Sequence, residues 1–166
     1  RGRVSGSYLS TANVNTPGQV IVAGDLESLS LLHEIAEAAG ARRVVPLDVA
    51  GAFHTVAMIP ARDCIREQLL ALALEDPLTP VVANLDGRLL STGAEIRTEL
   101  SEHISAPLRW WDGVRTLMDL GVSHIVEFGH KGVLTGMIRR VVQDVSLHNV
   151  YDATSAHAVA KELHDA

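Results

Sequence analysis

Short apolar runs of strand length alternate with stretches of helical apolar spacing along this chain. Residues 20–23 predict a short buried strand, Asp25 can cap the helix that follows, and Gly40 can end it. The apolar run at residues 42–49 predicts a second strand. Strand, helix and strand in this order are typical of half of a split βαβ unit.

The alternation continues to the C-terminus. The spacing predicts helices over residues 60–74, 94–103, 107–121, 133–142 and 156–163, and strands over residues 80–84, 122–128 and 148–151. Asn, Pro and Gly are frequent in residues 13–19, which predicts turn structure there. Helices that alternate with strands imply an α/β fold with a largely parallel sheet.

The composition is that of a globular protein, because 47% of the 166 residues are hydrophobic and 20% are charged. The net charge of −6, without a basic cluster, argues against a nucleic-acid partner. No apolar run reaches membrane-spanning length, so no membrane partner is expected. The lone Cys64 excludes a disulfide framework and a thiolate metal cage, and fits a reducing, cytoplasmic location.

The tetrapeptide Gly51-Ala52-Phe53-His54 lies between the predicted strand at residues 42–49 and the next helix. A histidine in such a loop suits proton transfer, because its unperturbed pKa lies near neutrality. The alternative is an ordinary loop imidazole that bonds the backbone. The residues around His54 favour the catalytic interpretation.

Six short motifs follow one another along the chain. They are Asn-Val-Asn-Thr-Pro-Gly-Gln (13–19), Gly-Ala-Arg-Arg (40–43), Gly-Ala-Phe-His (51–54), Pro-Val-Val-Ala-Asn-Leu-Asp-Gly (80–87), Ala-Pro-Leu-Arg-Trp (106–110) and Val-Glu-Phe-Gly-His-Lys-Gly-Val-Leu (126–134). In this order they resemble the malonyl-CoA:acyl carrier protein transacylase family, to which the acyltransferase domains of polyketide synthases are related. Together the motifs cover nearly the whole chain.

The resemblance implies a fold and a domain division. Family members are longer than this chain, and their fold resembles an α/β-hydrolase core with an inserted ferredoxin-like subdomain. Residues 1–49 would then be part of the ferredoxin-like subdomain, and residues 50–166 the C-terminal part of the large acyltransferase subdomain. The chain begins at Arg1 without a methionine, which suggests a fragment.

The resemblance also implies ping-pong transfer of a malonyl group from malonyl-CoA to the phosphopantetheine thiol of acyl carrier protein. No cofactor or metal is expected. His54 matches the family's catalytic histidine, and the backbone carbonyl that orients it aligns with His103. The family's nucleophilic serine lies in a Gly-His-Ser-x-Gly elbow, which these 166 residues lack, since Ser5 and Ser7 do not have its spacing. The carboxylate-binding arginine is likewise expected from the missing N-terminal half of the enzyme.

Four further residues are predicted to bind substrate by the same resemblance. Phe53 would exclude an α-methyl branch by its volume and so favour malonyl, although a plain core phenylalanine is the alternative. Asn13, Asn15 and Gln19 match a loop near the pantetheine channel, where amides can donate and accept hydrogen bonds. Simple turn formation explains those three residues equally well.

Two other functions remain open at the level of sequence. The chain also fits an acyltransferase domain of a polyketide synthase or of a large fatty acid synthase. A non-catalytic remnant that binds a carrier protein belongs to a different class. Flanking ketosynthase sequence, or a Gly-His-Ser-x-Gly motif before Arg1, distinguishes these cases.

Overall fold

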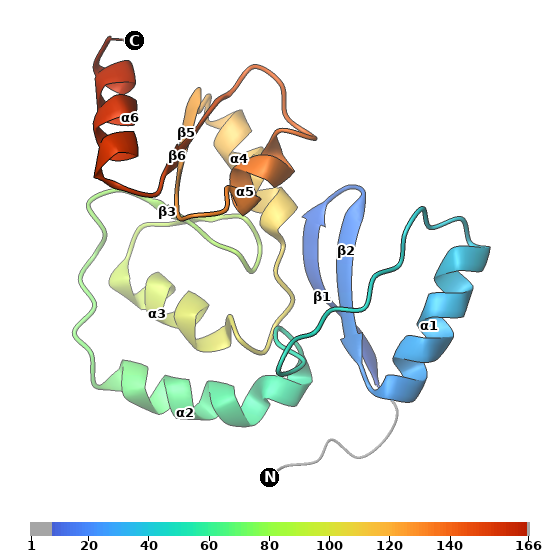
Figure 1. Cartoon of the computed structure of the whole chain (residues 1–166). Helices are drawn as coiled ribbons and strands as arrows, with labels where there is room; N and C mark the ends of the chain where they lie inside the picture. The colour runs from blue at the N-terminus through green and yellow to red at the C-terminus, as the bar shows by residue number, and fades with distance from the viewer. Residues whose placement is uncertain (1–7, 166) are drawn as a thin grey trace. The chain divides into compact units, whose positions relative to one another are not determined.

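The computed structural model describes residues 8–165, which form two compact units. The first unit ends at Gly113 and the second begins at Val114, inside a helix. Helices and strands alternate through both units, as Figure 1 shows by colour along the chain. The predicted subdomain boundary between residues 49 and 50 stays a prediction.

The first unit opens with an antiparallel hairpin of β1 (Leu9–Thr16) and β2 (Gln19–Gly24). The predicted strand at residues 20–23 is therefore present, but its residues are exposed or half-buried and not buried as predicted. The turn predicted for residues 13–19 is shorter than expected. Only the two residues between the strands form the turn. Two register shifts along β1 accommodate its asparagines within the strand, because irregular pairing tolerates poor strand formers.

Helix α1 (Leu26–Ala38) begins and ends where the sequence predicts. The Asp25 carboxylate accepts hydrogen bonds from the backbone N–H of Ser28 at 2.9 Å and from that of Tyr8 at 2.7 Å. Bonds from Ser28 and Tyr8 lower the pKa of Asp25 to about 2. Gly40 follows the helix with a φ of +89°, the left-handed conformation that glycine adopts at low cost.

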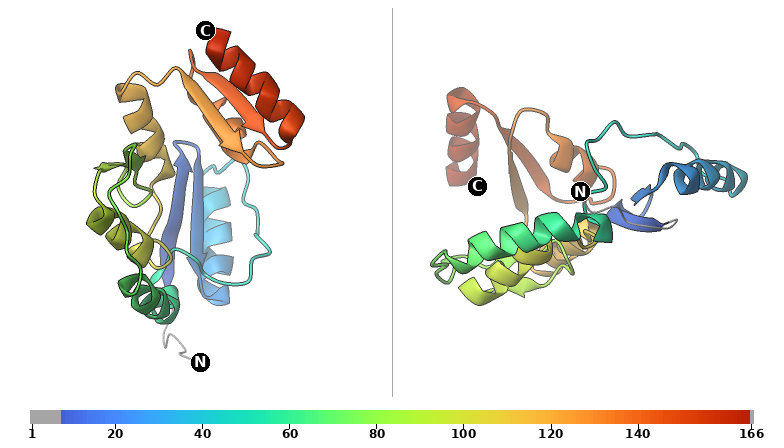
Figure 2. Two further views of the ribbon diagram at one scale, coloured as in Figure 1. Left: turned by 90° about the vertical axis from the view of Figure 1, so that its left-hand side faces the viewer. Right: turned by 90° about the horizontal axis from the view of Figure 1, so that it is seen from below.

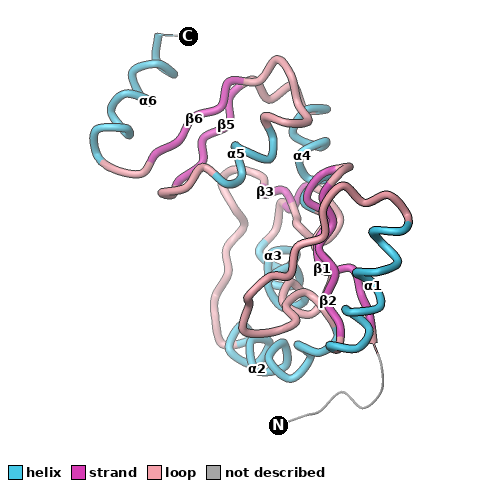
Figure 3. Tube along the Cα trace, turned by 45° about the vertical axis from the view of Figure 1, so that its right-hand side comes forward, coloured by secondary structure: helices cyan, strands magenta, loops and turns pink. Residues whose placement is uncertain are grey.

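Residues 41–50 form no strand, so the second predicted strand is wrong, and with it the split βαβ unit. Pro46 lies in the middle of this run and cannot donate a ladder hydrogen bond. The apolar side chains of the run are mostly exposed, including Leu47 and Val49. Figure 3 shows the connection from α1 to the next helix as a long loop.

The remainder of the first unit packs two helices beside a short strand pair. Its elements are a 3₁₀ turn (Val56–Met58), α2 (Ile59–Leu70), β3 (Val81–Val82), β4 (Leu89–Leu90) and α3 (Gly93–Glu102). β3 and β4 pair antiparallel, and α2 contacts α3. Leu69, Ala83 and Leu90 are buried there.

The second unit is built around a parallel strand pair. It begins within α4 (Trp110–Asp119) and contains β5 (His124–Phe128), α5 (Val133–Ile138), β6 (Ser146–Val150) and α6 (Ala153–Asp165). β5 and β6 pair in parallel, and Figure 2 shows α6 running alongside them. Of the three strand pairs in the described chain, β5–β6 is parallel and the other two are antiparallel. The described residues therefore do not form the largely parallel sheet that the sequence predicted.

Successive residues of a strand point to opposite faces of a sheet. Two polar networks therefore lie on opposite faces of the β5–β6 pair. Glu127 and Asn149, which are register partners, bond Thr135 of α5. His148 is one residue away from Asn149 and contacts Glu162 of α6. The two helices therefore cover opposite faces of the pair.

Within residues 8–165, no helix combines the length and the apolar character that crossing a bilayer requires.

Candidate functional site

The backbone of His54 adopts a left-handed conformation, with a φ of +63°. This conformation costs a residue with a Cβ about 1–2 kcal/mol. The backbone N–H of His54 donates to the carbonyl oxygen of Ile104 at 2.8 Å, which helps to hold the unfavourable geometry in place. Strain of this kind often concentrates at functional positions.

The imidazole of His54 is oriented by a backbone carbonyl. Its Nδ1 lies 2.8 Å from the carbonyl oxygen of His103, the acceptor that the sequence resemblance implied. A carbonyl oxygen only accepts, so Nδ1 carries the hydrogen and, in the neutral ring, Nε2 carries the lone pair. No hydrogen bond reaches Nε2 from the described residues. This arrangement leaves Nε2 able to accept a proton, which is what a general base requires.

The ring of His103 also lies against that of His54, edge-on, with centroids 5.3 Å apart. Burial lowers the pKa of His103, and the positive charge that His54 can carry lowers it further, against the opposing effect of Glu99. His103 therefore favours its neutral form. It orients His54 through its main chain without adding a fixed positive charge beside it.

Thr55 fixes the loop immediately after His54 and was missed by the sequence reasoning. Its side chain is buried, with 1% exposure, and its hydroxyl donates to the carbonyl of Ala52 at 2.7 Å. The same oxygen accepts from the backbone N–H of Ala57 at 3.3 Å and so caps the 3₁₀ turn. Threonine is a preferred N-cap residue, so a threonine directly before residues 56–58 could have indicated that a helical turn begins there.

Asn13 is attached to the segment that orients His54. Leu108 donates its N–H to Ala12 at 2.8 Å, and its carbonyl accepts from Val14 at 2.8 Å, forming a parallel bridge at Asn13. One segment, residues 103–108, thus contacts His54 at one end and β1 at the other. Asn13 lies in the central part of β1, on the framework that positions His54.

The other predicted amides are placed differently. Asn15 is half-buried within β1, near its turn end. Gln19 is exposed at the start of β2 and pairs with Thr16 across the hairpin turn. The structure therefore places the three amides along the hairpin rather than in one cluster, and their substrate contacts stay predictions.

Phe53 is not a core residue, because 42% of it is exposed. Its ring lies close to Gly51, where an added Cβ would meet Cε2 of Phe53 at 3.8 Å. The exposed ring directly precedes His54, which suits a residue that contacts the acyl group. Its effect on acyl-group size stays a prediction.

Three further features of the chain bear on the chemistry of the site. Arg109 pairs with Asp112 at 2.5 Å and is therefore already neutralised. Ser5 and Ser7 lie outside the described residues. Across residues 8–165 no group of three or more His, Cys, Asp or Glu side chains is arranged to hold a metal ion.

Comparison with known proteins agrees with this geometry. No protein-family model matches the chain. Over 158 residues, the chain is 35% identical to the malonyl CoA-acyl carrier protein transacylase of Escherichia coli (strain K12), an alignment that covers 95% of this chain and 51% of the relative. The chain thus spans about half the length of such relatives.

Solved structures give the same result. The acyl-carrier-protein S-malonyltransferase of Burkholderia pseudomallei matches with a TM-score of 0.88 and 32% identity, over 93% of this chain and 50% of that one. A malonyl-transacylase in complex with a type II PKS acyl-carrier protein matches with a TM-score of 0.88 and 33% identity, over 95% and 51%. These neighbours confirm the predicted α/β acyltransferase fold. In sequence and in fold, the chain matches about half of a malonyl-CoA:acyl carrier protein transacylase.

Proposed function

We propose that this chain supplies the general base for transfer of a malonyl group from malonyl-CoA to the phosphopantetheine thiol of acyl carrier protein. The observation that carries the proposal is the orientation of His54, whose Nδ1–H is held by the His103 carbonyl and whose Nε2 has no partner among the described residues. The similarity to these transacylases supports the reaction class.

The reaction has two matching halves. Nε2 of His54 takes the proton of a serine hydroxyl as that oxygen attacks the thioester carbonyl, and then gives the proton to the departing coenzyme A sulfur. In the second half, Nε2 takes the proton of the carrier thiol, which attacks the malonyl-serine ester. The imidazolium then returns the proton to the serine oxygen.

The serine and the carboxylate-binding arginine must come from outside these residues. We propose that they lie in the other half of the family's chain, which packs against this one. Large apolar side chains such as Leu26, Leu78 and Phe128 are exposed in the described structure, and side chains of this kind are normally covered in a complete domain.

We further propose acyl carrier protein as the partner, malonyl-CoA as the donor and the cytoplasm as the location. A structural neighbour is a malonyl-transacylase in complex with a carrier protein of polyketide synthesis. A polyketide carrier remains the alternative to a fatty acid carrier. Transfer assays with both carrier types distinguish the two.

The test is His54→Ala in the intact protein, assayed with malonyl-CoA and holo-carrier protein. Loss of the general base lowers the rate of malonyl-enzyme formation on the order of 10²–10⁴-fold. His157→Ala is the matched control, because His157 is an exposed histidine that bonds only the Ala153 carbonyl of its own helix within the described structure. A His54→Ala enzyme that forms the adduct at the control's rate rules out the proposed base.

A further inference from the structure

Two arginines of α2 hold the carboxylate of Glu102, the last residue of α3. Nη2 of Arg66 donates to Oε1 of Glu102 at 2.8 Å, and Nη1 of Arg62 lies 3.6 Å from Oε2. The side chains of Arg62 and Glu102 are 22% and 28% exposed, so water and salt screen this pair less than a fully exposed one. Arg62, Arg66 and Glu102 form an ion-pair cluster that connects α2 to α3, which lie side by side in Figure 1 and Figure 2.

A neighbouring contact fixes the orientation of the Arg62 guanidinium. Its Nε and Nη2 donate to Oδ1 of Asp63 at 3.0 and 2.8 Å, and its Nη1 faces Glu102. Isolated surface ion pairs stabilise a protein little, whereas several charges in one network act together. The cluster is therefore better suited to setting a position than to adding stability.

The cluster ends directly before the two carbonyls that hold His54. The carbonyl of His103 accepts from Nδ1 of His54 at 2.8 Å, and the carbonyl of Ile104 accepts from its backbone N–H at 2.8 Å. The carbonyl of Glu102 accepts from the backbone N–H of Ser105 at 2.9 Å, which closes a turn around this pair. Since consecutive Cα atoms lie only about 3.8 Å apart, a shift of Glu102 moves both carbonyls with it.

The connection from His54 to α2 is equally short. Thr55 follows His54, and its carbonyl accepts from the backbone N–H of Met58 at 2.9 Å, within the 3₁₀ turn that leads into α2. His54 therefore lies before the start of α2, and its acceptor His103 lies after the end of α3. The spacing of these two helices sets the distance between Nδ1 and the carbonyl.

A second contact holds the opposite ends of the two helices. Nη2 of Arg97 in α3 donates to the carbonyl of Leu72, just beyond the end of α2, at 2.8 Å. The helices therefore run antiparallel. Of these two contacts, the ion-pair cluster is the one at the end where His54 and His103 meet.

We propose that the ion-pair cluster positions His54, because it sets the spacing of α2 and α3 at which the His103 carbonyl accepts from Nδ1. Without the cluster, the end of α3 shifts and Nδ1 loses its acceptor. The hydrogen of the neutral ring then moves to Nε2 in part of the molecules, because the hydrogen bond of one nitrogen decides which nitrogen is protonated. A ring with its hydrogen on Nε2 cannot take a proton there. The effect on transfer rests on the proposed function, whereas the effect on the ring does not.

The decisive variant is Glu102→Lys, which places a third positive charge beside Arg62 and Arg66. ¹⁵N NMR of the imidazoles in the intact protein, near neutral pH, reports which nitrogen of His54 carries the hydrogen. We expect Nδ1 to carry it in the wild-type protein, and both tautomers to be present in the variant. A variant with the wild-type tautomer overturns the proposal.

The rate of malonyl-enzyme formation at saturating malonyl-CoA measures the consequence for transfer. We expect Glu102→Lys to lower this rate at least about tenfold, since misplacing a reacting group by about 1 Å can cost up to about 10²-fold. We expect little change in the KM for malonyl-CoA. A changed tautomer with an unchanged rate contradicts the proposed base, but it supports the positioning of the ring.

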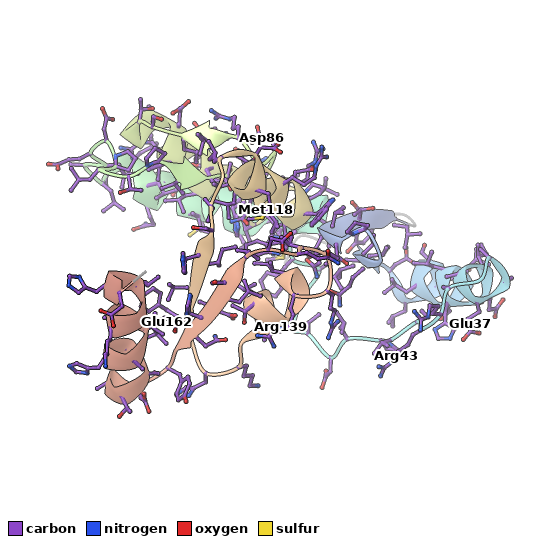
Figure 4. The ribbon with its side chains drawn as sticks, turned by 90° about the horizontal axis from the view of Figure 1, so that it is seen from above. Glu37, Arg43, Asp86, Met118, Arg139 and Glu162 are labelled. Atoms are coloured by element: carbon purple, nitrogen blue, oxygen red, sulfur yellow. The ribbon has the colours of Figure 1, made fainter. Side chains whose placement is uncertain are left out.

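Asp86→Lys is the matched control, because Asp86 pairs with Arg88 at 3.3 Å on the β3–β4 turn of the same unit. Figure 4 labels Asp86. Reversing this charge breaks an ion pair away from His103, so we expect the wild-type tautomer and rate. Equal losses in Asp86→Lys and Glu102→Lys overturn the proposal.

Adding Arg66→Glu to Glu102→Lys restores opposite charges across the two helices. We expect this double variant to recover the Nδ1 tautomer and most of the rate, and a double variant no better than Glu102→Lys alone contradicts the proposal. If Glu102→Lys does not fold, Arg66→Gln takes its place, because it removes the 2.8 Å bond from a side chain that is 54% exposed. An unchanged His54 tautomer in Arg66→Gln then overturns the proposal.

Discussion

His54 and His148 are both anchored through Nδ1, yet their environments differ at the opposite nitrogen. His54 bonds a backbone carbonyl at 2.8 Å, and no described residue bonds its Nε2. His148 faces a carboxylate at 3.5 Å, and its Nε2 is engaged by His124 at 3.1 Å. An anchored imidazole thus becomes a proton acceptor or a structural connection according to whether its second nitrogen is left open.

The strongest test of this contrast makes the same substitution at both positions. His54→Gln should lower malonyl transfer on the order of 10²–10⁴-fold, because the amide cannot serve as a base near neutral pH. His148→Gln should change the rate by no more than about twofold, as for most substitutions outside a site. Steady-state transfer assays on the intact protein compare them. Similar losses in both variants would contradict the different roles of the two histidines.

The next largest effect concerns the support of the His54 loop. Thr55→Val keeps the side-chain shape but removes the hydroxyl bonded to Ala52 and Ala57. An unsatisfied buried group of this kind costs about 1–3 kcal/mol in the free energy of unfolding. Denaturant unfolding measures the loss, with Thr55→Ser as the control that retains the hydroxyl. A fully stable Thr55→Val protein would show that the hydroxyl does not hold the loop.

A smaller effect follows from backbone conformation. At His54, with its φ of +63°, glycine should be more stable than alanine by up to about 1 kcal/mol. At His148, inside a regular strand, the order should reverse, because glycine weakens strand interiors. Thermal unfolding of the glycine and alanine variants at each of the two positions shows which residue is more stable there. The same order at both positions would contradict the left-handed conformation of His54.

The smallest effect is a pH dependence at His103. Its pKa is lowered in the folded protein, so between the unfolded value of 6.5 and the lower folded value the unfolded state binds more protons. Stability therefore falls as the pH falls below 6.5. His103→Gln should flatten this slope in unfolding experiments and retain transfer activity, because the carbonyl remains. Loss of transfer in this variant would assign a direct role to the ring.

Strong local signals predicted most of the elements. Asp25 and Gly40 marked the two ends of α1, and the motif order predicted the contact between His54 and the carbonyl of His103. The failed prediction was the strand at residues 42–49, where an apolar run suggested pairing. Pro46 opposes pairing there, and within residues 8–165 no strand lies beside this run.

Other features depend on contacts between residues distant in sequence. The pairing of His124 with His148, 24 residues apart, follows from the parallel register of β5 and β6. The backbone N–H of His54, a residue with a left-handed φ, bonds the carbonyl of Ile104, which is 50 residues away and which no local pattern indicates. Thr55 was recognisable as a capping residue, but its burial was not.

The segment of residues 103–108 fixes a distance within the first unit. At one end the carbonyls of His103 and Ile104 bond His54, and at the other end Leu108 bonds β1. Three residues, Ser105 to Pro107, separate the two sets of hydrogen bonds. One inserted residue would add up to about 3.6 Å of chain, longer than either set of hydrogen bonds tolerates. Pro107, with its fixed φ, further limits how such an insertion can be absorbed. The length of this short connection, more than the identity of its side chains, sets the spacing between the proton acceptor and the strand that carries Asn13.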